Sequence, residues 1–214
     1  MEPISLSATH VTKHYGGVTA LADGNIDVNA GQVVALLGAN GSGKSTLSKI
    51  ITGVVAPDGG QLLLDGQSIN FSSPQAAKKH GITAVYQELS LIPDMTVAEN
   101  IWLTHEPLSF GFRLNRGKRR QQTRDLLKLF EGTVSSQLTP DVAVKQLTPD
   151  ERQIVEILKA LSINPRLIIL DEATASLDSQ QVSRLFELVN QWKKEQKAIV
   201  FVSHRMDEIF RIAD

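Results

Sequence analysis

The sequence of 214 residues predicts an α/β fold with a mainly parallel sheet at its core. Apolar strand patterns alternate with helical patterns, which is typical of a parallel sheet covered by helices on both faces. Two late segments, 167–170 and 198–202, are continuous aliphatic runs, as expected for central buried strands. A third apolar run, 33–37, leads straight into a glycine-rich loop and then into a helical pattern.

The first elements are strands at 26–28 and 33–37, separated by a turn at 29–31. The helix after the glycine-rich loop is predicted to bury one face, because apolar residues recur at helical spacing: Leu47, Ile50, Ile51 and Val54. The segment 57–60, Pro-Asp-Gly-Gly, is predicted to break that helix.

Three shorter elements follow. A strand at 61–65 enters a tight turn at Gly66. Ser73 is the predicted cap of a short helix that has Pro74 at its first position and closes at Gly81. The strand 82–86 then ends at Gln87.

The segment 88–164 reads as helix and loop without a strand. Thr96 and Glu99 form the pattern of a capping box ahead of an apolar run. A basic stretch comes next: Arg113, Arg116, Lys118, Arg119, Arg120 and Arg124. A solvated helix face with its preceding loop explains this stretch better than a nucleic-acid surface.

The glycine-rich loop has the pattern Gly-x-x-x-x-Gly-Lys-Ser, and its position between a strand and a helix indicates a phosphate-binding loop. Its glycines allow backbone N–H groups to surround a polyphosphate at a helix N-terminus. Lys44 would reach the β- and γ-phosphates, and the Ser45 hydroxyl would bind Mg²⁺. The alternative is a glycine-rich turn without a ligand. The predicted nucleotide contacts are Gly38, Asn40, Gly41, Ser42, Gly43, Lys44, Ser45 and Thr46.

Charged and polar residues follow the two late strands. Asp171 and Glu172 end the first, where α/β sheets place their ligands. Asp171 is positioned to hold Mg²⁺, and Glu172 to orient or deprotonate an attacking water. His204 follows the second strand, and we expect a role at the γ-phosphate rather than a purely structural one.

Composition excludes several other classes of protein. A net charge of −1 gives no broad basic surface for nucleic acid, and the absence of cysteine excludes a disulfide framework. The N-terminus lacks the pattern of a signal peptide, and no apolar run approaches the roughly 20 residues of a membrane span. We therefore expect a soluble protein that meets any membrane through a partner.

The order and spacing of these motifs resemble the nucleotide-binding domain of ABC ATPases over the whole chain. The resemblance implies a P-loop NTPase with a core of residues 1–87 and 165–214, a helical subdomain of residues 88–164 and a small antiparallel N-terminal sheet. It also implies individual roles. Tyr15 would stack on adenine, Gln87 would contact Mg²⁺ and water, Asp178 would communicate across a dimer, and His204 would sense the γ-phosphate.

Four strings, at 86–93, 97–100, 154–161 and 203–209, are similar to the first half of the fused ATPases of bacterial monosaccharide importers, such as the ribose, xylose, galactose and autoinducer-2 systems. This resemblance implies a second ATPase half, of which the present chain would be the N-terminal partner.

One motif departs from the family. The signature Leu-Ser-Gly-Gly-Gln falls at 147–151, where this chain has Leu-Thr-Pro-Asp-Glu. Thr148 and Glu151 instead form a capping box with Pro149 at the first helical position. We expect Asp150 and Glu151 to make this turn a poor phosphate clamp. Ala173, where the family usually has proline, is expected only to loosen a turn.

The resemblance implies an ATPase that uses ATP and Mg²⁺ to energise an importer, for a monosaccharide or related sugar. Its partners would be a second ATPase half, membrane permease subunits and, indirectly, a periplasmic solute-binding protein, with no nucleic acid. Its place would be the cytoplasmic face of the inner membrane, as a peripheral protein. The alternatives are a soluble ABC-type ATPase outside transport and an ATP-binding regulator without hydrolysis.

Overall fold

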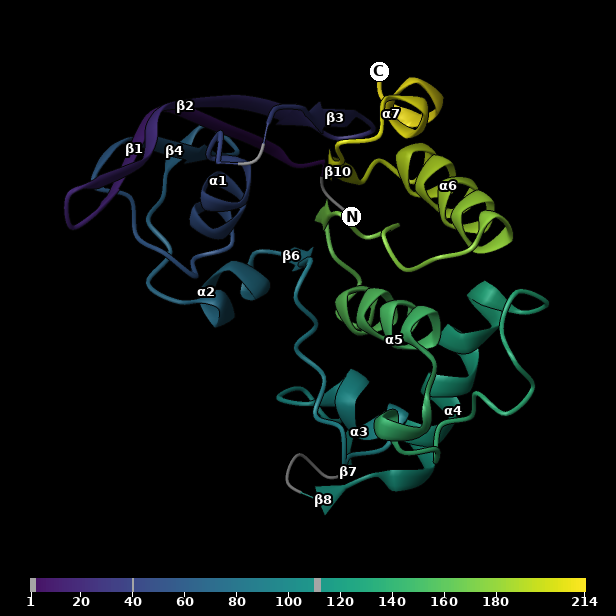
Figure 1. The fold of residues 1–214 in the computed structure, drawn as a ribbon. Coiled ribbons are helices and arrows are strands. Elements are labelled where there is room, and N and C mark those ends of the chain that lie inside the picture. Colours follow the sequence, from purple (N-terminus) through teal and green to yellow (C-terminus); the bar gives the residue numbers. More distant parts are fainter. Residues whose placement is uncertain (1–2, 40, 110–112) are drawn as a thin grey trace. The chain divides into compact units, whose positions relative to one another are not determined.

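The computed structural model describes residues 3–39, 41–109 and 113–214, which form two compact units (Figure 1). The first unit comprises Met1–Tyr86, Pro165–Glu172 and Val189–Asp214. The second comprises Gln87–Asn164 and Ala173–Leu188, so it contains the segment with Asp178 as well as residues 88–164.

A four-stranded parallel sheet forms the centre of the first unit. Its strands lie in the order β3 (Val33–Leu36), β10 (Ala198–Val202), β9 (Leu167–Asp171) and β6 (Ile82–Val85). Both β9 and β10 are buried along their whole length, as their aliphatic runs predict. Val202 pairs with Leu36 on one side and with Asp171 on the other. The carboxyl ends of three strands therefore share one edge of the sheet.

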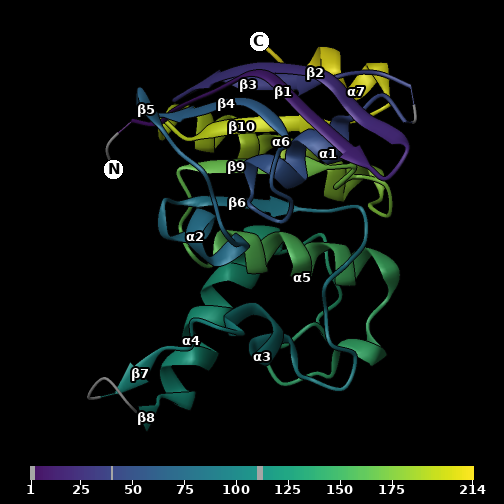
Figure 2. The same ribbon diagram turned by 90° about the vertical axis from the view of Figure 1, so that its left-hand side faces the viewer.

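The predicted antiparallel sheet is confirmed. It has the order β2-β1-β4-β5, formed by β1 (Ser5–Tyr15), β2 (Val18–Asn29), β4 (Gly59–Leu64) and β5 (Gln67–Ser68). Alternate residues of β1, β2 and β4 point into a shared core that also contains side chains of β9 and β10. Figure 2 shows these strands turned toward the viewer.

Helix α1 (Lys44–Ile51) follows the glycine-rich loop and packs against both β2 and β9. Leu47, Ile50 and Ile51 are buried as predicted. The prediction for Val54 is wrong, because its side chain is 46 % exposed. The helix ends before it, at Thr52 and at Gly53, whose φ of +71° stops the helical path.

Two further helices complete the first unit. Ser73 caps α2 (Pro74–Lys79), where its Oγ accepts a hydrogen bond from the N–H of Ala76, as predicted. Helix α7 (Met206–Ile212) follows the segment with His204. The long helix α6 (Ser179–Lys194) begins in the second unit and ends in the first.

The second unit is mainly helical. It contains α3 (Val97–Trp102), α4 (Arg116–Leu127), α5 (Pro149–Leu161) and the short 3₁₀ turns η1 (Lys128–Phe130) and η2 (Val144–Gln146). The expectation of no strand in this region is wrong, since β7 (Leu108–Ser109) and β8 (Arg113–Leu114) form a small hairpin. Two residues per strand give no periodicity that a sequence pattern could reveal.

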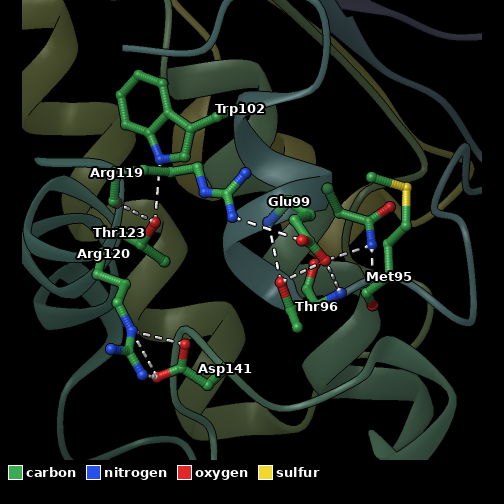
Figure 3. Close-up of polar contacts among 9 residues, drawn as sticks. Met95, Thr96, Glu99, Trp102, Arg119, Arg120, Thr123 and Asp141 are labelled. Atoms are coloured by element: carbon green, nitrogen blue, oxygen red, sulfur yellow. Dashed lines mark hydrogen bonds and ion pairs between the residues drawn. The ribbon is translucent and has the colours of Figure 1, made fainter. Parts of the chain in front are cut away.

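Part of the basic stretch is paired within the second unit, as Figure 3 shows. The guanidinium of Arg120 donates two hydrogen bonds from Nε to the Asp141 carboxylate, at 2.7 and 3.0 Å, and Arg119 lies 3.4 Å from Glu99. Glu99 also closes the predicted capping box with Thr96 at the start of α3.

Among the described residues, none of the helices combines the length and apolar character that a membrane crossing requires.

Candidate functional site

The glycine-rich loop joins β3 to α1 at the carboxyl edge of the parallel sheet. Gly41 and Gly43 have φ values of +83° and +92°, which other residues rarely adopt. A Cβ on Gly43 would lie 2.7 Å from Leu21 Cδ1, so the loop passes close to β2. Ser42, Ser45 and Thr46 lie along the loop and the first turn of α1, whereas Asn40 lies outside the described residues.

The Lys44 ammonium lies over this loop. It donates hydrogen bonds to the carbonyl oxygens of Gly38, at 2.7 Å, and Ala39, at 3.0 Å. The cation, the glycine backbone and the N-terminus of α1 are thus gathered at one place. Each of these features attracts an anion, and together they fit a polyphosphate.

Ser45 and Asp171 form the candidate metal pair. Ser45 lies in the first turn of α1, and Asp171 ends β9, where the Ser45 hydroxyl acts to lower the pKa of the Asp171 carboxyl. Burial raises the pKa of Asp171 above its usual value, while the Ser45 hydrogen bond opposes that shift and the charge of Glu172 adds to it. A hydroxyl and a carboxylate are the oxygen ligands that Mg²⁺ prefers, and a cation would relieve the buried charge.

Glu172 lies beside His204 at the same edge of the sheet. Its Oε1 lies 3.3 Å from His204 Nδ1, and its N–H donates to the carbonyl of Val202 at 2.9 Å. Glu172 adopts a φ of +51°, unusual for a residue with a Cβ. Strained backbone of this kind concentrates at functional sites, so we infer that the turn aims the Glu172 side chain.

A buried carboxylate supports the His204 segment, and sequence reasoning missed it. Glu208 is 1 % exposed; it accepts a hydrogen bond from Ser203 Oγ at 2.9 Å and pairs with Arg205 at 2.7 Å. Ser203 and Arg205 flank His204 in the chain. The sequence pattern indicates only that Glu208 lies on a helix, four residues after His204. That position does not predict a buried carboxylate.

Three predicted residues lie apart from this cluster or in the other unit. Tyr15 belongs to the first unit, at the end of β1, with a half-exposed ring and Lys13 Nζ 5.6 Å from its centroid. Gln87 and Asp178 belong to the second unit. Asp178 caps α6, since its Oδ1 accepts from the N–H groups of Gln180 and Gln181 at 2.8 Å.

Polar contacts that the sequence did not predict connect the segment after Gln87 to α5. Ser90 Oγ donates to the buried Glu156 carboxylate at 2.6 Å, and Lys159 Nζ donates to Ser90 Oγ at 2.8 Å. Asn100 accepts from the N–H of Ile92 at 2.7 Å. The second unit therefore holds the residues that follow Gln87 in a defined conformation.

The altered signature forms the predicted capping box at the start of α5. The N–H of Thr148 donates to Glu151 Oε2 at 3.1 Å, and Pro149 occupies the first helical position. Partial burial would raise the pKa of Asp150, but hydrogen bonds from Gln181, Thr148 and the backbone together hold it below its usual value. The turn therefore carries the negative charge of Asp150, and the Thr148 N–H already has an acceptor in Glu151.

Comparisons with known proteins agree with this geometry. A family described as ABC transporter matches residues 21–175. The chain is 47 % identical over 204 residues to the ribose import ATP-binding protein RbsA 1 of Rhizobium johnstonii, covering 95 % of this chain and 39 % of the relative. It is 41 % identical to the ribose import ATP-binding protein RbsA of Rhodopirellula baltica, covering 100 % of this chain and 41 % of the relative.

Solved structures give the same result. A dimeric post-hydrolysis ATP-binding cassette bound to ADP and Pi has a TM-score of 0.81 and 27 % identity, over 95 % of this chain and 89 % of that one. A nucleotide-free ATP-binding cassette from an ABC transporter has a TM-score of 0.79 and 26 % identity, over 99 % of this chain and 85 % of that one. The family match, the relatives and the phosphate-loop geometry agree, and the chain belongs to the ABC transporter family.

Proposed function

We propose that this chain binds and hydrolyses ATP to energise an importer of a monosaccharide or related sugar. The observation that carries the proposal is the Glu172 carboxylate, whose Oε1 lies 3.3 Å from His204 Nδ1 at the sheet edge from which the phosphate loop also leaves. The named relatives are ribose import proteins, and this supports the sugar assignment. The chain spans about 39 % of the length of the relative from Rhizobium johnstonii.

Nucleotide binding is assigned to the loop and to an aromatic ring. The loop backbone and Lys44 would hold the phosphates, and the half-exposed Tyr15 ring would stack on the base. Asp178 would contribute from the second unit. The proposed contacts in the loop are Gly38, Asn40, Gly41, Ser42, Gly43, Lys44, Ser45 and Thr46.

Ser45, Asp171 and Gln87 are the residues proposed to hold Mg²⁺. When bound, the ion neutralises phosphate charge and polarises the transferred group. The Asp171 carboxylate, whose ionised form burial disfavours, is stabilised by a cation. The Ser45 hydroxyl would supply a second oxygen ligand.

Hydrolysis is assigned to Glu172, with His204 and Gln87 in support. The Glu172 carboxylate accepts a proton from water as the water oxygen forms its bond to the γ-phosphorus and the bond to the leaving oxygen breaks. His204, 3.3 Å from Glu172, holds that carboxylate and contacts the γ-phosphate. Gln87 offers one donor and one acceptor to the water.

The altered signature is proposed to form a weak or silent site. ABC dimers hold each ATP between the phosphate loop of one half and the signature of the other. A carboxylate of this turn about 5 Å from a phosphate charge would repel it by roughly 3 kcal/mol at an effective dielectric near 20. The intact loop of this chain, completed by a second half, would then be the one competent site.

The remaining parts of the proposal concern assembly. Residues 1–87 and 165–214 would form the nucleotide-binding core, and residues 88–164 the helical subdomain. A second ATPase half, membrane permease subunits and, indirectly, a periplasmic binding protein would be the partners. The protein would act at the cytoplasmic face of the inner membrane, without nucleic acid.

A second candidate function is ATP binding without hydrolysis, in a regulatory role. The self-capped turn at Thr148 and Glu151 favours it, because the turn's donors are already occupied. Glu172 beside His204 favours hydrolysis.

The deciding test is ATP binding and phosphate release by the full-length protein with Mg²⁺. Binding with steady turnover that rises when permease subunits are added supports the importer. Binding without turnover in their presence favours the regulator, and no ATP binding overturns both.

A further inference from the structure

The side chain of Gln181, in the first turn of α6, links three segments of the second unit. It is 2 % exposed. Its Oε1 accepts the N–H of Asp178 at 3.1 Å, and its Nε2 donates to Asp150 Oδ2 at 2.7 Å and to the carbonyl of Thr133 at 3.0 Å. Both amide hydrogens and the carbonyl oxygen are therefore used.

One end of this link is the loop that carries Asp178. The Asp178 carboxylate accepts the N–H of Gln181 at 2.8 Å, while the Gln181 side chain accepts the N–H of Asp178. These two residues thus bond each other reciprocally at the start of α6. A displacement of the Asp178 backbone must either move the Gln181 amide or break one of these bonds.

The other end is the altered signature turn, Thr148 to Glu151. The Asp150 carboxylate accepts from the Gln181 amide, and its pKa lies below its usual value despite partial burial. A hydrogen bond to an ionised group is stronger than one between neutral groups. An ordinary signature has glycine at this position and offers no acceptor side chain to Gln181.

We propose that Gln181 is a positioning residue that couples the Asp178 loop to the altered signature turn, so that a displacement of either segment is transmitted to the other. The use of this link in ATP turnover rests on the proposed function, whereas the coupling itself is a property of the second unit.

The experiment measures hydrogen exchange at single amides in the full-length protein without nucleotide. Asp178→Ala is the perturbation, and the amides of Asp150, Glu151 and Arg152 are the readout. We expect Asp178→Ala to raise their exchange rates about fivefold, the effect of losing roughly one hydrogen bond. In the Gln181→Leu background the same perturbation should change them less than about twofold.

Gln180→Leu is the matched control, because Gln180 is its exposed neighbour of the same type. In that background the fivefold response should persist. The proposal is overturned if Asp178→Ala leaves the three amides unchanged in the native background. It is also overturned if the response survives Gln181→Leu, because a merely structural glutamine would leave the response in place.

If Gln181→Leu does not fold, Asp150→Ala tests the same link from the other end. It removes one acceptor from a half-buried position and should raise exchange at Gln180 and Gln181 about fivefold. Unchanged rates overturn the proposal. ATP binding by the unmutated full-length protein separates the two ideas, because its absence would overturn the proposed function and leave the exchange result standing.

Discussion

Glu172 Oε1 lies 3.3 Å from His204 Nδ1, although the two residues are separated by 32 positions in sequence. The parallel pairing of β9 with β10 produces this proximity, because Asp171 and Val202 are in register and the next residues leave the sheet together. The histidine side chain is 63 % exposed, whereas that of the glutamate is 17 % exposed. The pair therefore places a shielded carboxylate behind a group that faces solvent.

Glu172→Gln should abolish phosphate release by the full-length protein while ATP still binds. The amide cannot accept a proton, and general-base catalysis typically contributes about 10²- to 10⁴-fold. Single-turnover phosphate release together with a nucleotide-binding assay checks both halves of this expectation. Glu131→Gln, at an exposed position, should leave turnover intact. Turnover within about threefold of wild type in Glu172→Gln would assign the base to another group.

Asp171→Asn should stabilise the ligand-free protein at neutral pH. The pKa of Asp171 is raised on folding, so the folded state binds the proton more tightly than the unfolded chain. Stability is then lost as pH rises from about 3.9 through the folded-state pKa, and asparagine avoids that loss. We expect a Tm higher by about 2–4 °C at pH 7, with no difference below about pH 3.5.

The same variant should lose the response to Mg²⁺. Wild-type protein gains thermal stability with ATP and Mg²⁺ together, while Asp171→Asn gains no more than it does with ATP and EDTA. Equal gains from Mg²⁺ in both proteins would remove Asp171 from the proposed metal site.

Lys44→Ala should weaken ATP binding about 100-fold with little loss of stability. The ammonium bonds two loop carbonyls, Gly38 and Ala39, which water can replace at this partly exposed position. Titration with a fluorescent ATP analogue and thermal unfolding measure the two effects. Lys49→Ala, on the exposed face of the same helix, should bind nucleotide like wild type. An equal loss of ATP affinity in Lys44→Ala and Lys49→Ala would show that the overall positive charge, and not the position of Lys44, determines binding.

Restoring the signature with Thr148→Ser, Pro149→Gly, Asp150→Gly and Glu151→Gln should open the turn to phosphate. The variant loses two negative charges and the proline, and gains dimerisation and turnover with ATP and Mg²⁺. It also loses the Asp150–Gln181 bond and should unfold more easily, by about 1–3 kcal/mol. Size-exclusion chromatography measures the dimerisation, and a phosphate-release assay measures the turnover. Brisk turnover by the native chain, second order in protein, would show that Asp150 and Glu151 do not repel phosphate.

Glu208→Ala should destabilise the segment that presents His204. The change leaves the Ser203 hydroxyl without its buried acceptor and removes the nearer of the two carboxylates that pair with Arg205, at a cost of about 1–3 kcal/mol. Glu208→Gln keeps one acceptor for Ser203 and should lose less. Chemical denaturation gives the free energies of unfolding. The support assigned to Glu208 is wrong if alanine and glutamine variants unfold like wild type.

The sequence predicts the parallel core and the site edge well, because long aliphatic strands and a phosphate loop leave strong local patterns. Asp171, Glu172 and His204 could be expected near one edge of the sheet, because each follows one of the two late aliphatic strands. Val54 was mispredicted because apolar spacing continued past Gly53, where a positive φ ends the helix. A periodic pattern reports which side chains are apolar, not where the backbone turns.

Tertiary polar contacts were the part that the sequence could not supply. Gln181 and Glu208 occupy ordinary helix positions, and their roles depend on Asp150 and Ser203, which other segments bring to them. The capping box at Thr148 was foreseen because its partners are three residues apart. The bond between Asp150 of the same turn and Gln181, 31 residues away, has no local signature.

The order of strands in the parallel sheet constrains how the protein is made. Within that sheet β3, which leads into the phosphate loop, pairs only with β10, more than 160 residues later. The helices of the second unit close through local contacts and can form earlier during synthesis. The nucleotide loop gains its strand partner only when residues 198–202 have left the ribosome, so a nascent chain interrupted before that point lacks a formed phosphate site.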